Sequence, residues 1–389
     1  MNPRLTRQEL LRRGVAGMTV LSLPGLLAAC GGGGGGGGGT ETNGQVNDVL
    51  NFSNWELYID TPSLRKAAGM PPHPTTLEQF TKKTGIKVNY YEDINGNPEY
   101  FATVQGRLSQ GQGIGRDIIV STDNDKFLGE YLDNNWALKL DKSLIPNIAN
   151  LTDVQAHPPF DPNRDYTLPW FSGMDGIAWN EDVTGPVTSV TQLLTDPKLK
   201  GKVGVWGQMG DTLGLIMLQN GDDPAKVTDE SFAKALATLK TAVDSGQIRK
   251  FYGNDYAQPL STGDLAASMA WSGDIVNLQN PKLKWVIPEA GGIIWTDNML
   301  IPLGGSVPTA STYMNYVYDP KIAAQLALGA NYISSVKGVK EEAAKINPKA
   351  TENTLVFPTD EMLSQMHQND PTMFSNQDYV DQWLQVKGT

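Results

Sequence analysis

The chain has 389 residues, of which 40% are hydrophobic, together with a formal net charge of −11 and a single cysteine. The negative charge argues against nucleic acid as a partner, and one cysteine excludes an intramolecular disulfide. The length exceeds what one hydrophobic core usually serves, so we expect two domains beyond any leader.

The N-terminal segment has the pattern of an export signal followed by a tether. Arg12 and Arg13 precede an apolar run over 15–27, and Cys30 precedes nine consecutive glycines. The run is too short to cross a hydrocarbon core of about 30 Å, so it is not a permanent anchor. Residues 1–29 therefore resemble a bacterial lipoprotein signal peptide, with Cys30 as the lipidated residue and 30–46 as a flexible tether. This resemblance implies an exported protein held by lipid at the outer face of the cytoplasmic membrane, in the periplasm or at the cell surface.

The chain after the tether alternates between strand-like and helix-like patterns. Gly85, for example, ends an amphipathic stretch in the way that a glycine ends a helix. The alternation predicts an α/β fold with a sheet flanked by helices. In the first part of the chain we expect strands at 49–52, 86–91 and 117–120, with helices at 76–84, 99–108 and 125–132.

A stretch rich in proline and aspartate at 158–169 interrupts this alternation and is expected to cross between two lobes. The same alternation then continues to the C-terminus. Here we expect strands at 203–206, 266–271, 283–287 and 293–302, with helices at 212–219, 229–245, 321–333, 361–366 and 378–386.

Several kinds of chemistry have no motif in the sequence. His73, His157 and His367 are far apart and lack metal-ligand spacing, so we expect neither a metal site nor a cofactor. The common motifs of serine hydrolases, zinc proteases and phosphate-binding loops are also missing from the sequence. A hydrolase built on paired carboxylates stays open as an alternative, because any acidic protein offers such pairs.

Tryptophans stand beside carboxylates or amides near the ends of several predicted strands. Trp55 precedes Glu56, and the segments Trp271–Asp274 and Trp295–Asp297 repeat the pairing. Ligands of open α/β sheets bind at the carboxyl ends of strands. Tryptophan rings attract ammonium groups, and carboxylates bind them through charge-assisted hydrogen bonds. The pattern suits an alkyl chain with an ammonium at each end. Other roles stay open for these residues: each tryptophan could pack in the core, Asp211 could cap a helix, and Asp274 could stabilise a turn.

The chain resembles the polyamine (spermidine/putrescine) binding proteins of bacterial ABC importers, within the type II periplasmic binding protein family. The segments that carry the resemblance follow the family's order over nearly the whole mature chain. They are 51–58 (NFSNWELY), 78–88 (EQFTKKTGIKV), 159–166 (PFDPNRDY), 271–274 (WSGD), 291–297 (GGIIWTD) and 367–370 (HQND).

The resemblance implies two α/β lobes, each a mixed sheet flanked by helices, with a ligand cleft between them. Residues 47–173 plus 297–341 would form lobe 1, and 174–296 plus 342–389 would form lobe 2. Asp123 stands where spermidine-type members have a tyrosine, Gln208 stands where an aspartate is usual, and 62–74 is an insertion expected beside the cleft mouth. The implied ligand-binding residues are Trp55, Tyr58, Trp271 and Trp295 as walls, Asp297, Asp211 and Asp274 for ammonium groups, and Ser121, Asp123, Gln208, Tyr332 and Gln368 as further cleft residues.

The function that the resemblance implies is capture of putrescine or spermidine and delivery to an ABC permease driven by a cytoplasmic ATPase. We expect no catalysis, no cofactor and a monomer. Another amine or a different solute is the nearest alternative, and an exported hydrolase is the alternative from another class of protein.

Overall fold

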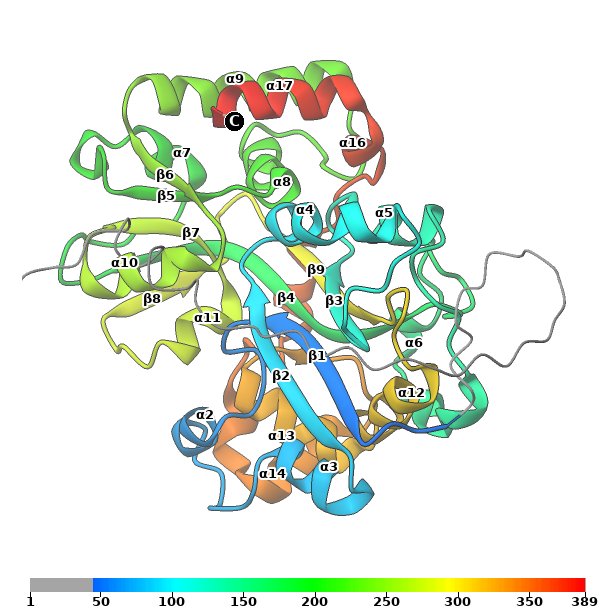
Figure 1. The fold of residues 1–389 in the computed structure, drawn as a ribbon. Coiled ribbons are helices and arrows are strands. Elements are labelled where there is room, and N and C mark those ends of the chain that lie inside the picture. The colour runs from blue at the N-terminus through cyan, green and yellow to red at the C-terminus, as the bar shows by residue number, and fades with distance from the viewer. Residues whose placement is uncertain (1–44, 389) are drawn as a thin grey trace, which may run out of the picture. The chain divides into compact units, whose positions relative to one another are not determined.

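The computed structural model describes residues 45–388 (Figure 1). The expected signal peptide, Cys30 as the expected lipidation site and nearly all of the expected tether lie outside the described residues. Between residues 45 and 388, no helix combines the length and the apolar composition that a membrane crossing needs.

The expected alternation of strands and helices is confirmed. One helix, α3 (Thr76–Thr84), has the predicted bounds, because Thr75 and Glu78 form a reciprocal capping box at its start and Gly85 ends it at φ +81°. The strands are β1 Val49–Trp55, β2 Lys87–Ile94, β3 Ile118–Thr122, β4 Thr167–Asn180, β5 Val203–Trp206, β6 Ile248–Tyr252, β7 Ala267–Trp271, β8 Leu283–Val286, β9 Gly292–Leu300, β10 Ile333–Ser334 and β11 Met366–His367. The other α-helices are α2 Pro62–Ala67, α4 Asn97–Leu108, α5 Phe127–Asp133, α6 Asp153–Ala156, α7 Val190–Thr195, α8 Met209–Gln219, α9 Asp229–Asp244, α10 Ala257–Thr262, α11 Ser272–Asn277, α12 Val307–Val317, α13 Pro320–Ala330, α14 Val339–Ile346, α15 Asp360–Ser364, α16 Thr372–Ser375 and α17 Gln377–Lys387, and the 3-10 turns are η1 Lys142–Leu144, η2 Pro146–Asn150, η3 Pro197–Leu199, η4 Asn254–Tyr256 and η5 Pro348–Glu352.

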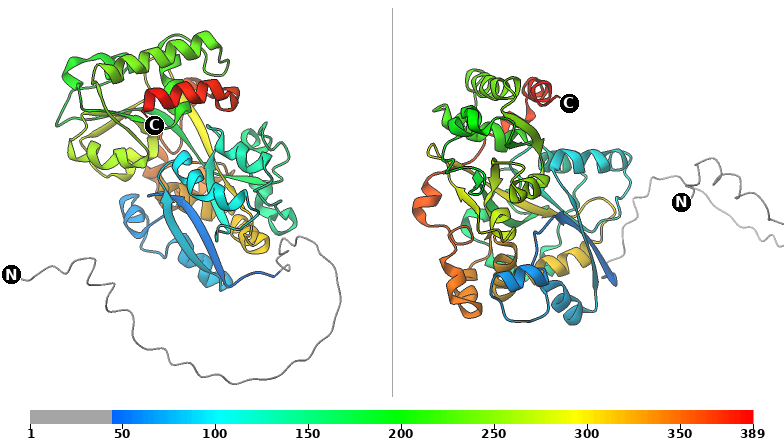
Figure 2. Two further views of the ribbon diagram at one scale, coloured as in Figure 1. Left: turned by 45° about the horizontal axis from the view of Figure 1, so that its top comes forward. Right: turned by 90° about the vertical axis from the view of Figure 1, so that its left-hand side faces the viewer.

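The strands form one mixed sheet in the order β2-β1-β3-β9-β4-β7-β5-β6. Parallel pairs lie at the two ends, β1 with β2 and β3, and β5 with β6 and β7, while the central pairing of β4 with β9 is antiparallel. Helices α3, α12 and α13 lie near the β1–β2 end, whereas α7, α8, α9 and α17 lie near the β5–β6 end (Figures 1 and 2). The two ends of the sheet are therefore joined through β4 and β9.

Strand β4 was not predicted, and it begins at Thr167, inside the stretch 158–169 that was expected to cross between two lobes. All fourteen residues of β4 are buried, but its sequence contains two glycines and a proline, which usually argue against a central strand. The glycines are needed because a Cβ at Gly173 would overlap the Trp295 ring, and one at Gly176 would overlap Trp285. The predicted helix 321–333 is also too long, because Asn331 adopts φ +60° and ends α13.

The sheet curls so that the loops beyond its two outer strands touch. The backbone N–H of Asn254, just after β6, donates to the carbonyl of Asn95, just after β2, at 3.0 Å. The Asp255 N–H donates to the side chain of the same Asn95 at 3.2 Å. Since β2 and β6 are at opposite ends of the strand order, this contact closes the curl into a ring.

The insertion 62–74 packs against another helix of the same end of the molecule. Its helix α2 packs against α13, and the buried Arg65 forms a 2.6 Å ion pair with Asp60. None of its residues lines the cavity described below, and its expected position beside the mouth stays a prediction.

Candidate ligand-binding site

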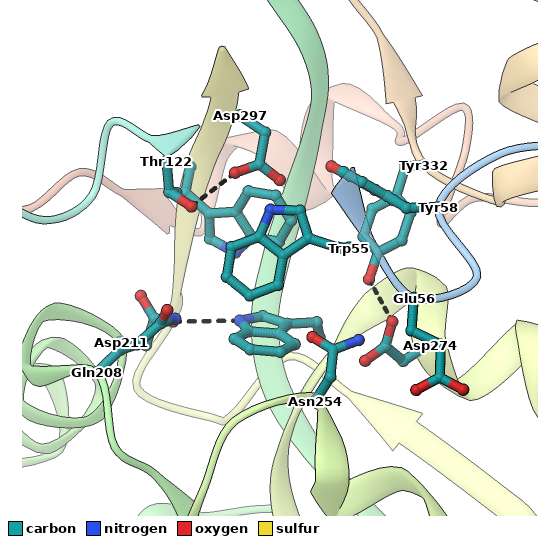
Figure 3. Close-up of a pocket in the computed structure, with 12 residues that line it drawn as sticks. Trp55, Glu56, Tyr58, Thr122, Gln208, Asp211, Asn254, Asp274, Asp297 and Tyr332 are labelled. Atoms are coloured by element: carbon teal, nitrogen blue, oxygen red, sulfur yellow. Dashed lines mark hydrogen bonds between the residues drawn. The ribbon is translucent and has the colours of Figure 1, made fainter. Parts of the chain in front are cut away.

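A cavity lies inside the curl of the sheet (Figure 3). Residues at the ends of β1, β3 and β7, in β9, and in the segments after β5 and β6 line it, so most of the sheet contributes. Nine of the twelve residues predicted as ligand-binding are among its lining. The full lining is Trp55, Glu56, Tyr58, Thr122, Gln208, Asp211, Asn254, Trp271, Asp274, Trp295, Asp297 and Tyr332.

Three indole rings form the aromatic wall. Trp271, the last residue of β7, meets Trp55 edge to face with ring centroids 6.0 Å apart and meets Trp295 at 6.4 Å. Behind it, Trp206 stacks on Trp271 at 5.3 Å, and Trp206 is fully buried. Core packing and cavity lining are therefore not exclusive here, because Trp271 does both while Trp206 belongs to the core alone.

Asp297 is held against β3 by a cross-strand pair. It lies opposite Thr122 in the β3–β9 ladder, and the Thr122 hydroxyl donates to Asp297 Oδ1 at 2.6 Å. Burial raises the pKa of Asp297 to about 7. The buried hydroxyl of Tyr58 has no hydrogen-bond partner within the described structure, and its pKa is raised by burial and by the negative charge of Asp297.

Asp274 lies in the first turn of α11, directly after β7. The hydroxyls of Tyr332 and Tyr256 donate to its two oxygens at 2.8 Å and 2.9 Å. Burial raises the pKa of Asp274 to about 6, and the charge of the exposed Glu56 contributes in the same direction. Both oxygens accept from tyrosines that belong to distant parts of the chain, so the proposed turn role for Asp274 does not account for its contacts.

Asp211 lies in the first turn of α8, but it does not cap that helix. Its oxygens accept from Gln208 Nε2 at 2.8 Å, from Trp271 Nε1 at 3.2 Å and from the side-chain amide of Asn124. Burial raises the pKa of Asp211 to about 6, although these donors favour the ionised form. The side chain therefore joins helix α8 to the tryptophan wall.

The arrangement of charge is the main chemical feature of the cavity. Asp211, Asp274 and Asp297 lie at separate points around the Trp55 ring (Figure 3), and none of the twelve described lining residues is a lysine or arginine. Uncompensated buried carboxylates are costly, and a cation in the cavity would remove that cost. In residues 45–388 no cluster of histidine, cysteine, aspartate or glutamate has the arrangement of a metal site. The cavity therefore suits an organic ligand with several ammonium groups joined by apolar links.

The other three predicted residues do not line the cavity. Ser121 and Asp123 flank Thr122, and because side chains alternate along a strand they point away from it. Asp123 accepts the backbone N–H of Thr296 at 2.8 Å and borders a separate hollow beside α5, where burial raises its pKa to about 6. Gln368, just after β11, is exposed.

Three lining residues were not predicted as ligand-binding. Thr122 could have been found from the alternation in β3, once its pairing with Asp297 was known. Glu56 lies within the Trp55 motif and was not assigned a role. Asn254 follows β6, a strand that the sequence analysis did not predict, so no sequence signal pointed to it.

Comparison with known proteins identifies a family and several relatives. The family model described as bacterial extracellular solute-binding protein matches residues 75–357. The spermidine/putrescine-binding periplasmic protein of Salmonella typhimurium is 25% identical over 322 residues, covering 82% of this chain and 85% of the relative. Spermidine/putrescine-binding periplasmic protein 1 of Haemophilus influenzae is 24% identical over 378 residues, covering 96% and 98%.

The fold likeness extends to solved structures. The TpPotD lipoprotein of Treponema pallidum superimposes with a TM-score of 0.70 at 19% identity, covering 88% of this chain and 100% of that one. The expected periplasmic-binding-protein-like α/β fold is confirmed by this likeness.

Proposed function

The chain belongs to the family of bacterial extracellular solute-binding proteins, and from this premise we propose that it captures a polyamine, putrescine or spermidine, and delivers it to an ABC importer. The relatives named above are spermidine/putrescine-binding periplasmic proteins. Capture and release require no bond to be made or broken, so the chain acts without catalysis. The importer's permease, driven by its cytoplasmic ATPase, is the partner.

The observation that carries the proposal is three buried carboxylates around an aromatic wall with no lysine or arginine in the lining. A diamine or triamine places a positive charge at each end of a flexible alkyl chain. The indole rings contact the methylene groups, and their faces attract the ammonium groups. An amino acid fits less well, because no lining side chain supplies a cation for its carboxylate.

We propose that the ligand closes two lobes with the boundaries expected from the sequence, 47–173 plus 297–341 and 174–296 plus 342–389. The chain passes between the two proposed lobes three times, and two of these crossings support the division. They fall in β4 and β9, next to the irregular pairing between Pro169 and Ser172, where a sheet bends most easily. The third crossing falls inside α14. A hinge in the irregular segment 353–359, beyond that helix, would break fewer helical hydrogen bonds than a hinge inside it.

The proposal includes the placement of the protein. Residues 1–29 would be removed on export, and lipid on Cys30 would hold the chain at the outer face of the cytoplasmic membrane. We expect the protein to act as a monomer.

Isothermal titration calorimetry of the purified protein with putrescine, spermidine and spermine tests the assignment. We expect dissociation constants in the micromolar range or below for at least one of the three. The matched control is 1,4-butanediol, which has the carbon chain of putrescine but no charge and should give no heat. No binding of any polyamine to folded, ligand-free protein at pH 8 would contradict the proposal and leave only the family and the fold.

A further inference from the structure

A fourth carboxylate, Asp175, lies beside the cavity and is absent from its lining. It is the ninth residue of β4, and its side chain is fully buried. Trp295 Nε1 donates to Asp175 Oδ1 at 2.7 Å. The other oxygen, Oδ2, is buried and has no hydrogen-bond partner within the described structure.

The sheet register explains why Asp175 meets the tryptophan wall. Asp175 pairs with Trp271 of β7 on one side and with Ile293 of β9 on the other. Residues opposite each other in a sheet share a face, so the Asp175 and Trp271 side chains lie on the same side. Gly173, two residues earlier, leaves room for the Trp295 ring on that face. Asp175 is therefore placed to fix the plane of one cavity wall.

Asp175 and Asp211 form a pair of buried carboxylates without a counter-charge. Burial raises the pKa of Asp175 well above its ordinary value, and the negative charge of Asp211, on α8, raises it further. Burial also raises the pKa of Tyr256 of η4, to which the charge of Asp175 contributes. No ion pair between described residues includes either carboxylate. Two such groups cannot both hold a charge at low cost, so one retains a proton.

Hydrogen bonding decides which of the two is ionised. Asp211 accepts from Gln208, Trp271 and Asn124, which stabilise a carboxylate. Asp175 has one donor, Trp295, and its free Oδ2 is suited to carry a proton. We propose that Asp175 is a neutral carboxylic acid that positions the Trp295 indole, while the negative charge of the pair stays on Asp211, where a ligand ammonium can use it.

The role of this carboxylate pair in ligand binding rests on the proposed function, whereas the protonation of Asp175 does not. The first test is infrared spectroscopy of the full chain without ligand, comparing wild type with Asp175→Asn. At neutral pH we expect wild type to show the C=O stretch of a protonated acid that the variant lacks. In Asp211→Asn the neighbouring charge is gone, so the same band should disappear at a lower pH than in wild type. Absence of an assignable acid band in wild type, or no shift in Asp211→Asn, would overturn the proposal.

The second test is binding of putrescine and spermidine by calorimetry. Asparagine keeps an acceptor for Trp295 and imitates a neutral acid, so Asp175→Asn should retain the affinity within about threefold. Leucine has a similar size and no acceptor, so Asp175→Leu should weaken binding at least tenfold, as should Asp211→Asn, which removes the charge. A loss in Asp175→Asn as large as in Asp211→Asn would show that Asp175 binds as an ionised group. If wild type binds neither polyamine, the proposed function fails, and the infrared result still decides the state of Asp175.

Discussion

Binding of a polyamine should depend steeply on pH, with Asp297 as the main cause. In the empty cavity burial raises the pKa of Asp297 to about 7 and that of Asp274 to about 6. A bound ammonium favours the ionised form of each carboxylate, so binding near neutral pH releases protons. The affinity for the polyamine is therefore highest at pH values above the pKa values of the carboxylates in the empty cavity, and it falls as the pH drops through those values.

The magnitude follows from the two pKa values. When a carboxylate must be ionised for binding, its protonation lowers the apparent affinity by the factor 1 + 10^(pKa − pH). Between pH 8 and pH 6 this amounts to roughly tenfold for Asp297 and roughly twofold for Asp274, or about 20-fold together. Asp211, whose pKa is raised to about 6, brings the expected loss to about 40-fold. The ammonium groups of the ligand stay protonated throughout this range.

Calorimetry at pH 6, 7 and 8 with wild type and Asp297→Asn separates the contributions. The variant leaves a ligand ammonium without its carboxylate, which should cost about 2–5 kcal/mol at pH 8, roughly 30-fold to several thousandfold in Kd. Its remaining pH dependence should be only about fourfold, from Asp274 and Asp211. Asp381→Asn, on an exposed position of α17, removes the same charge and should match wild type. A flat wild-type profile, or an unchanged profile in Asp297→Asn, would refute the reasoning.

Two further predictions concern the scaffold. A Cβ at residue 253 would overlap the carbonyl of Asn95, so Gly253→Ala should separate the loops that close the curl and weaken polyamine binding by about tenfold. The control is Gly106→Ala, in open space on α4, which should leave the affinity unchanged. Equal affinities of the two variants would show that the loop contact does not favour closure. Arg164 is fully buried and donates to the Asn298 side chain at 2.8 Å and to three further acceptors. Arg164→Met leaves these acceptors without their donor and should reduce the free energy of unfolding in urea by at least about 1–3 kcal/mol, and an unchanged free energy would contradict this role.

The fold was predictable where local signals agree with the tertiary structure. Helix α3 carries its own capping box and terminal glycine, so its bounds follow from the sequence. Strand β4 carries the opposite signals, because Gly173 and Gly176 serve aromatic side chains from other strands. Such glycines look like loop residues until the partner rings are known, which only the tertiary structure supplies.

The site was predictable to the extent that its residues lie in recognisable motifs at strand ends. Trp271 and Asp274 could be paired from the sequence because β7 leads directly into α11. Thr122 and Asp175 could not, because their roles depend on register. Thr122 faces the cavity only because it pairs with Asp297, and Asp175 meets Trp295 only because β4 and β9 pair as they do. Register across a sheet is a long-range property, and a one-residue shift would turn both side chains to the other face.

The same charges that recognise the ligand also bear on when the cavity closes. Closing the cavity without a cation buries Asp211, Asp274 and Asp297 without a counter-charge, and each must either take up a proton or stay ionised at a cost in free energy. The contact of Asn95 with the loop after β6 favours closure by only a few hydrogen bonds, each contributing about 0.5–1.5 kcal/mol. A polyamine removes the electrostatic cost in one step, so its differential affinity for the closed state is what shifts the population. On this reasoning an uncharged ligand of the same length would leave the protein open, because it would fill the cavity without neutralising it.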